Sequence, residues 1–190
     1  MRSAHHIVLI GPMGAGKSSL GRRLAEAHGV PFVDLDREIE SRAGRDIPTI
    51  FAEEGEAGFR AMEGDALEDV LAGPPCVLAS GGGAVLADAN RAAMRRHGFV
   101  VYLKIDVDEQ LRRLADDTSR PLIAGDDREA VLRRLAAQRA PLYADTADLV
   151  FEPAGLDKDT AAARLIDRIQ TAHPHAAWRP AAALATPESK

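Results

Sequence analysis

The pattern Gly-x4-Gly-Lys-Ser over residues 11–18 is the feature that most restricts how this chain can fold. It lies between an apolar run, residues 6–10, and a stretch with helical periodicity over residues 17–28. Glycines let the backbone N–H groups of such a loop wrap around phosphate oxygens, and the following helix directs its positive end at the same anion. Lys17 can neutralise phosphate charge, and the Ser18 hydroxyl suits Mg²⁺. The pattern therefore predicts that a nucleoside triphosphate binds at a strand–loop–helix junction.

The rest of the chain repeats this alternation of short apolar runs and amphipathic stretches. Strands are expected at residues 6–10, 32–34, 76–79, 99–103 and 149–151. Helices are expected at 17–28, from about 36, in two pieces between 47 and 71 that break at Gly55, at 88–97, 108–114, 129–142 and 158–171. This order predicts an α/β class, three-layer fold with a five-stranded parallel sheet flanked by helices.

We expect one domain over residues 1–172 and a disordered, Ala- and Pro-rich tail over residues 173–190. The polar stretch 115–127 is long for a connection in such a fold, which favours a mobile functional loop over a simple turn. A solvated loop without a role is the alternative reading of that stretch.

Composition argues against several other classes of protein. The formal charge of −5 and the 4% aromatic content give no reason to expect nucleic acid as a partner. The single cysteine, Cys76, excludes an internal disulfide framework. No apolar run reaches the ~18 residues of a membrane span, and the first apolar stretch is too short for a signal peptide. We therefore expect a cytoplasmic protein that does not bind membranes. We also expect a monomer, although composition has no bearing on that expectation.

The motifs beyond the glycine loop bear on what receives the phosphate. The Asn-Lys-x-Asp motif by which a GTPase normally binds guanine is not present. Leu103-Lys-Ile-Asp106 has the lysine and the aspartate but lacks the asparagine, so we interpret Lys104 as a strand end and Asp106 as a helix cap. Asp34 ends an apolar strand, and Asp36 follows two residues later. Strand alternation would place both carboxylates on one side, in a cleft at the carboxyl edge of the sheet. The alternative is that Asp36 caps the next helix.

Several separated motifs, in this order, resemble the shikimate kinase family over residues 6–170. They are Gly11–Ser18, Asp34-Leu-Asp36, Phe51-x3-Gly55-Glu56-x2-Phe59-Arg60-x2-Glu63, Ser80-Gly-Gly-Gly-Ala84, Arg120-Pro-Leu122 and Arg139-Ala-Pro-Leu-Tyr143. The resemblance implies transfer of the γ-phosphate of ATP to the 3-hydroxyl of shikimate, with Mg²⁺ as cofactor. It places this reaction in chorismate and aromatic amino-acid biosynthesis.

The resemblance also implies roles for individual residues. Lys17, Asp36 and Arg120 would be catalytic, with Arg120 on a lid at about 115–127. The nucleotide would contact Gly14, Ala15, Gly16, Lys17, Ser18, Ser19, Arg113, Arg120 and Pro153. The acceptor-binding region would be at about 34–63, with further contacts later in the chain. The acceptor would contact Asp36, Arg60, Gly81, Gly82, Gly83 and Arg139. Mg²⁺ would bind Ser18 and, mostly through water, Asp34.

Residue chemistry supports this assignment independently. Arginine presents a fork suited to a carboxylate, and Glu63 is placed at i+3 to orient Arg60. Phe51 and Phe59 either line the acceptor pocket or belong to the core. Asp36 either orients the acceptor hydroxyl or deprotonates it.

Two alternatives stay open on sequence alone. One is another small-molecule kinase with the same glycine loop, such as a gluconate kinase. The other is a non-catalytic nucleotide-binding module. The segment 152–157 lies where the family flanks adenine, and it lacks the basic residues that some members carry there.

Overall fold

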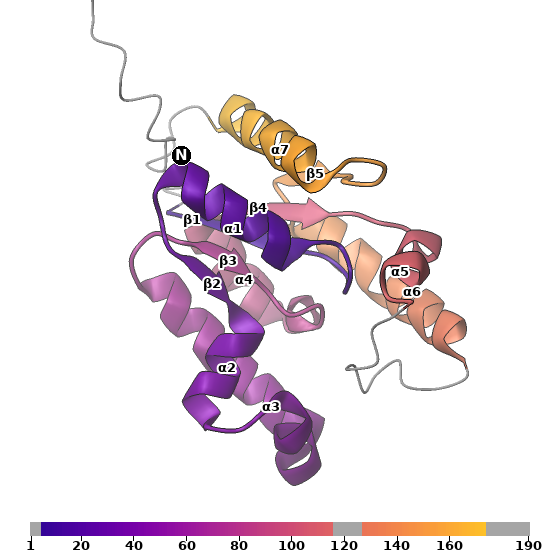
Figure 1. The fold of residues 1–190 in the computed structure, drawn as a ribbon. Helices are drawn as coiled ribbons and strands as arrows, with labels where there is room; N and C mark the ends of the chain where they lie inside the picture. The colour runs from indigo at the N-terminus through magenta and orange to yellow at the C-terminus, as the bar shows by residue number, and fades with distance from the viewer. Residues whose placement is uncertain (1–4, 116–126, 174–190) are drawn as a thin grey trace, which may run out of the picture.

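Five parallel strands form one sheet in the order β2-β3-β1-β4-β5 (Figure 1). The computed structural model describes residues 5–115 and 127–173. The strands are β1 (His6–Ile10), β2 (Phe32–Asp34), β3 (Val77–Ala79), β4 (Gly98–Leu103) and β5 (Leu149–Phe151). Each predicted strand is present, with β3 starting one residue later and β4 one residue earlier than expected. The predicted five-stranded α/β fold is confirmed.

The helices follow the predicted pattern, and apart from α3 and α6 their ends lie within one residue of the expected ones. They are α1 (Lys17–His28), α2 (Leu35–Ala43), α3 (Ile47–Ala72), the 3-10 turn η1 (Ala84–Leu86), α4 (Asp88–His97), α5 (Val107–Arg113), α6 (Arg128–Thr146) and α7 (Lys158–Ala172). The predicted break at Gly55 is an internal kink of α3, where φ is +70°. Helix α6 continues through Pro141 beyond the expected end at residue 142, which buries Tyr143 and Thr146.

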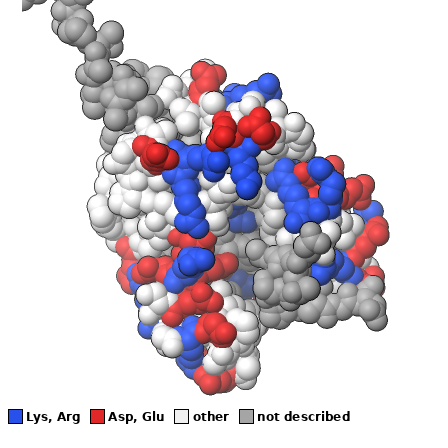
Figure 2. All heavy atoms as spheres, viewed as in Figure 1, with Lys and Arg blue, Asp and Glu red and all other residues white. Residues whose placement is uncertain are grey.

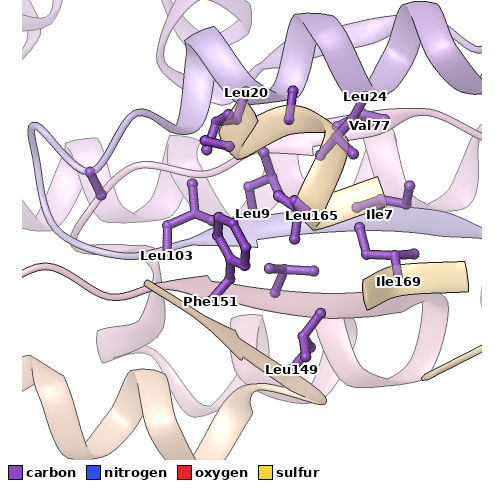
Figure 3. Packing of buried hydrophobic residues seen from close by; sticks show 14 of the residues in the cluster. Ile7, Leu9, Leu20, Leu24, Val77, Leu103, Leu149, Phe151, Leu165 and Ile169 are labelled. Atoms are coloured by element: carbon purple, nitrogen blue, oxygen red, sulfur yellow. The ribbon is translucent and has the colours of Figure 1, made fainter. Parts of the chain in front are cut away.

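Helices cover both faces of the sheet, so the strands read as continuous apolar runs. Alternate residues of β1 serve opposite layers. Ile7 and Leu9 pack with α1 and α7 in the cluster that Figure 3 shows, whereas Val8 and Ile10 pack with α3 and α4 on the other face. The central strand is thereby held on both sides, and its carboxyl end has a defined place.

The strand order fixes where a ligand can bind. Strand β1 lies between β3 and β4, and the chain leaves it toward β2 and later returns to build β4 on the opposite side. Ligands of open α/β sheets bind at such a reversal, at the carboxyl edge. In the parallel register Leu9 and Asp34 both pair with Ala79. The loops after β1, β2 and β3 therefore emerge together.

The structure tests some of the remaining sequence predictions, and others concern residues outside the described ranges. Strand β4 ends at Leu103, and the Asp106 side chain accepts a hydrogen bond of 2.7 Å from the Glu109 N–H, as expected of a cap for α5. Most of the expected lid, Arg120 and the tail from residue 174 lie outside the described residues. Among the described helices, none combines the length and apolar character needed to cross a membrane.

A buried histidine joins β1 to α3 and β3 at the amino edge of the sheet. His6 is 1% exposed; its Nε2 lies 3.2 Å from the Leu71 carbonyl oxygen, and its Nδ1 accepts a hydrogen bond from the Cys76 N–H. These contacts place the single ring proton on Nε2. Burial lowers the pKa of His6, and nearby His5 and His97 lower it further, against the raising effect of the Leu71 carbonyl. The folded state therefore holds this imidazole neutral.

We predict that acid below pH 6.5 destabilises the protein partly through His6. The unfolded chain takes up a proton near pH 6.5 and the folded chain does not, so this stability is present above pH 6.5 and is lost as pH falls. The slope contribution is about 1.4 kcal/mol per pH unit. His6→Gln should weaken folding at pH 7.5 and flatten the decline between pH 6.5 and 5.5 in urea unfolding. An unchanged slope would contradict this role.

Substitution by alanine should change the folding stability in opposite directions at two helical glycines. A Cβ at Gly21 of α1 would overlap the Phe32 ring and lie 3.2 Å from Leu9, whereas a Cβ at Gly64 of α3 would meet only Asn90, at 3.5 Å. We expect Gly21→Ala to destabilise the fold by about 1–3 kcal/mol through overpacking. Gly64→Ala should stabilise it by up to about 1 kcal/mol through helix propensity. Chemical denaturation of both variants tests the pair, and equal signs would refute it.

Candidate functional site

The glycine loop lies between β1 and α1, as predicted. Gly14 has φ +76° and Gly16, the N-cap of α1, has φ +93°, in the left-handed region that side chains other than glycine rarely adopt. Lys17 Nζ donates hydrogen bonds to the carbonyl oxygens of Gly11, at 2.7 Å, and Pro12, at 2.9 Å. Its ammonium group is therefore held over the first half of the loop, where it is placed to meet an anion.

Ser18 and Asp34 meet at the edge of the sheet. Ser18 Oγ donates a hydrogen bond of 2.7 Å to Asp34 Oδ2. Ser18 belongs to the first turn of α1, and Asp34 is the last residue of β2. A hydroxyl and a carboxylate oxygen side by side are the hard oxygen donors that Mg²⁺ prefers, so the pair fits that ion. The described residues contain no cluster of three or more His, Cys, Asp or Glu side chains arranged for a metal.

Asp36 reaches the same cleft by a different route from the one the sequence predicted. We expected strand alternation to align Asp34 with Asp36, but β2 ends at Asp34 and α2 begins at Leu35. Asp36 therefore projects from the first turn of α2. The expectation of one cleft for both carboxylates is confirmed, since both line the same cavity, but its stated reason is wrong. Nor does Asp36 occupy the cap position, which is that of Asp34.

Arg60 and Glu63, one turn apart on α3, form an ion pair. Arg60 Nη1 donates to Glu63 Oε2 at 2.6 Å, as the i+3 spacing predicted. Glu63 is 1% exposed, so burial raises its pKa while the Arg60 guanidinium lowers it. Phe59 is part of the core and Phe51 is half-buried; their rings lie 4.7 Å apart, and both face the cavity. The phenylalanines thus serve as core and pocket wall together.

The glycine run 81–83 lies directly against these charged groups. A Cβ at Gly81 would approach Asp36 Oδ1 to 2.8 Å and Glu63 Oε1 to 2.9 Å, and one at Gly83 would overlap the Arg60 guanidinium. Only a residue without a side chain leaves this space. Tyr143 fixes the middle of the run, because its hydroxyl donates a hydrogen bond of 2.5 Å to the Gly82 carbonyl oxygen.

Arg139 of α6 also lines the cavity, near Gly82. It is 9% exposed, and its Nε is buried without a hydrogen-bond partner among the described residues. The same holds for Arg60 Nε and Glu63 Oε1. Two guanidinium N–H groups and one carboxylate oxygen at a single cavity are costly to leave unsatisfied. Their presence indicates a polar ligand that carries both acceptors and donors.

Two of the hollows that border the glycine loop share Gly14, Gly16 and Ser19 and form one cleft. The acceptor-side cavity, of about 680 Å³, contains the six residues predicted for the acceptor: Asp36, Arg60, Gly81, Gly82, Gly83 and Arg139. The second, of about 880 Å³, is lined by Gly14, Ala15, Gly16, Ser19, Arg113 and Pro153, all predicted for the nucleotide. Lys17, Ser18 and Asp34 lie in the first. Arg120 lies outside the described residues.

The cleft also holds residues that sequence reasoning missed. Arg37 and Glu40 of α2 line the acceptor side, and Arg23 and Lys158 line the nucleotide side. Helical spacing from Asp36 could have indicated Glu40, at i+4. Arg23 and Lys158 carry no local signal, because α1 and α7 come together only in the folded chain. On the face shown in Figure 2, basic and acidic side chains stand next to one another over the helices.

Comparison with known proteins shows which family this chain is similar to. A family model described as shikimate kinase matches residues 13–170. The shikimate kinase of Stenotrophomonas maltophilia (strain R551-3) is 50% identical over 171 residues, which cover 90% of this chain and 95% of the relative. That of Xanthomonas campestris pv. campestris (strain 8004) is 48% identical over 179 residues, 94% of this chain and 97% of the relative.

Solved structures agree with the sequence matches. Shikimate kinase from Acinetobacter baumannii in complex with shikimate has a TM-score of 0.85 and 40% identity, with 90% of this chain and 95% of that chain covered. A sugar kinase from Janibacter sp. HTCC2649, at 17% identity and a TM-score of 0.62 over 91% of this chain and 98% of that chain, shares the fold alone. Because the family match extends from the glycine loop through the motifs on both sides of the cleft, the chain belongs to the shikimate kinase family.

Proposed function

We propose that this chain transfers the γ-phosphoryl group of ATP to the 3-hydroxyl of shikimate, giving ADP and shikimate 3-phosphate. The observation that carries the proposal is the single cleft in which the phosphate loop adjoins a cavity with a buried arginine, a half-buried arginine and a carboxylate. A hydroxylated carboxylic acid satisfies both kinds of group. Family membership favours shikimate over gluconate, which carries the same two functional groups.

At the phosphate end, the chain supplies positive charge and backbone donors. The loop N–H groups and the amino end of α1 bind the phosphates, and Lys17 leaves its loop carbonyls to contact the β- and γ-phosphates. Ser18 and Asp34, which are hydrogen-bonded to each other, would hold Mg²⁺. When bound, this ion neutralises charge on the phosphate oxygens. Arg113 and Pro153 border the part of the cleft that takes the nucleoside.

At the acceptor end, the groups divide between the carboxylate and the hydroxyls. Arg60 and Arg139 bind the carboxylate, since a guanidinium presents paired N–H donors. Glu63 holds Arg60 in place through the bond of 2.6 Å. Asp36, beside Gly81, accepts a hydrogen bond from an acceptor hydroxyl and orients it toward the phosphate loop. The glycine run lets the substrate ring approach the backbone.

The chemical step needs alignment and charge neutralisation above all. The acceptor oxygen forms a bond to the γ-phosphorus as the bond from that phosphorus to the bridging oxygen of ADP breaks. The hydroxyl proton leaves late in a loose transition state, so Asp36 contributes by orientation before it contributes as a proton acceptor. Lys17 stabilises the charge that develops on the leaving ADP. Arg120 remains a predicted contributor from outside the described residues.

The direct test is acceptor-dependent ADP formation. Purified protein with Mg²⁺ and ATP should release ADP with shikimate and should release little with gluconate or without an acceptor. Lys17→Met should reduce turnover by at least about a hundredfold, because one preorganised charge is worth several kcal/mol in the transition state. Nucleotide binding without acceptor-dependent ADP release would favour a non-catalytic module instead.

Gly83→Ala tests the acceptor pocket. The new methyl group displaces the Arg60 guanidinium, the end of a flexible side chain, and so removes a charged contact with the substrate carboxylate while leaving the fold intact. A charged hydrogen bond contributes about 1.5–3 kcal/mol, so KM for shikimate should rise about 10- to 100-fold. KM for ATP should stay within about twofold.

The matched control for this variant is Gly64→Ala on the same helix as Arg60. Its methyl group meets only an ordinary contact, so both Michaelis constants should remain those of the parent protein. A Gly83→Ala variant with an unchanged KM for shikimate would remove Arg60 from the acceptor site.

A further inference from the structure

The carbonyl groups of the phosphate loop need partners of their own. A loop that turns its N–H groups toward phosphate turns carbonyl oxygens outward, because C=O and N–H of one planar trans peptide point in opposite directions. An outward carbonyl without a donor leaves its peptide free to rotate. The conformation that binds phosphate is therefore maintained from outside the loop as well as by the ligand.

Helix α5 supplies donors to two consecutive loop carbonyls. Gln110 Nε2 donates a hydrogen bond of 3.0 Å to the Met13 oxygen, and Arg113 Nη1 donates one of 3.1 Å to the Gly14 oxygen. Lys17 serves the carbonyls of Gly11 and Pro12. The α5 donors come from 97 and 99 residues along the chain, so they join separate parts of the fold.

The two donors from α5 differ in whether a nucleotide in the cleft can reach them. Arg113 lines the nucleotide side of the cleft, so a bound nucleotide competes for its guanidinium. Gln110 is 3% exposed and lines neither of the two hollows that form the cleft. Its amide therefore stays on the Met13 carbonyl when Arg113 turns to the ligand.

The position of Gln110 is itself fixed by packing. Leu114, the C-cap residue of α5, is buried with Leu132 of α6, and Met13 packs against this pair. A Cβ at Gly14 would meet Leu114 Cγ at 3.3 Å, so α5 lies close against the loop backbone. The Asp106 cap fixes the start of the same helix. These contacts hold the Gln110 side chain against the loop.

We propose that Gln110 is a positioning residue of the nucleotide site. By holding the Met13 carbonyl toward α5, it points the Gly14 N–H of the same peptide away from α5, toward the phosphate that the loop encloses. The inference rests on the proposed function only in taking the loop's ligand to be a nucleotide. Gln110 touches no substrate and acts through the loop backbone.

The test measures nucleotide affinity directly. Gln110→Leu keeps the buried volume but removes the donor, and isothermal titration calorimetry should show Mg²⁺–ADP binding weakened about five- to tenfold, the effect of one lost hydrogen bond. KM for ATP should rise in parallel, with KM for shikimate within about twofold. Gln170→Leu, an exposed glutamine on α7, is the matched control and should bind ADP normally.

A second variant distinguishes positioning from packing. Gln110→Glu places an ionised carboxylate opposite the Met13 carbonyl at pH 8, which should weaken ADP binding at least as much as the leucine variant. Toward pH 5.5 the introduced carboxyl becomes protonated and donates again, so the ratio of its ADP affinity to that of the parent protein should rise. The melting temperature of the glutamate variant, measured at both pH values, separates this from a loss of packing: packing loss lowers stability and ADP affinity together, whereas positioning changes ADP affinity in a folded protein.

The outcomes separate this inference from the proposed function. Parent-like ADP affinity in folded Gln110→Leu, or a lowered melting temperature with unchanged affinity, would overturn the role of Gln110. ADP binding needs no acceptor, so failure of shikimate-dependent turnover would bear on the proposed function and leave this measurement interpretable. If the leucine variant does not fold, the pH response of Gln110→Glu decides the question.

Discussion

The burial of β1 on both faces is the constraint on which the rest of the structure depends. Residues Ile7–Ile10 of this strand are at most 1% exposed, and they anchor it between β3 and β4. The chain leaves this strand at the carboxyl edge and turns at once into the glycine loop. A loop that must present backbone N–H groups in one direction needs such a rigid support, because each peptide that rotates loses a donor.

Around this support, polar and charged side chains form hydrogen-bonded pairs. Ser18 bonds to Asp34 and Arg60 bonds to Glu63, each within 2.7 Å. Burial raises the pKa of Glu63, and the Arg60 guanidinium beside it acts in the opposite direction. Removing Arg60 would leave the buried Glu63 carboxylate without its partner, which is why this pair acts as a unit. The cleft is polar where ligands bind and apolar immediately behind.

The acceptor pocket shows how far pattern reasoning extends and where it stops. Helical spacing correctly predicted the Arg60–Glu63 pair, since residues three apart on a helix are neighbours whatever the fold. Strand alternation was the wrong reason for joining Asp34 to Asp36, because the chain changes from strand to helix between them. The prediction that both carboxylates lie in one cleft is still correct, because the first turn of α2 begins at the same edge of the sheet. Gln110 carries no motif and was not foreseen.

The sequence by itself determined the elements, their order and the chemistry of the loop. Glycines, capping residues and apolar periodicity act over a few neighbours, so they can be read without a fold. Only the tertiary structure decided which distant groups meet: Arg139 with Gly82, Gln110 with Met13, and α1 with α7 around the nucleoside side of the cleft. Such contacts arise from strand order and helix packing, which depend on the whole chain at once.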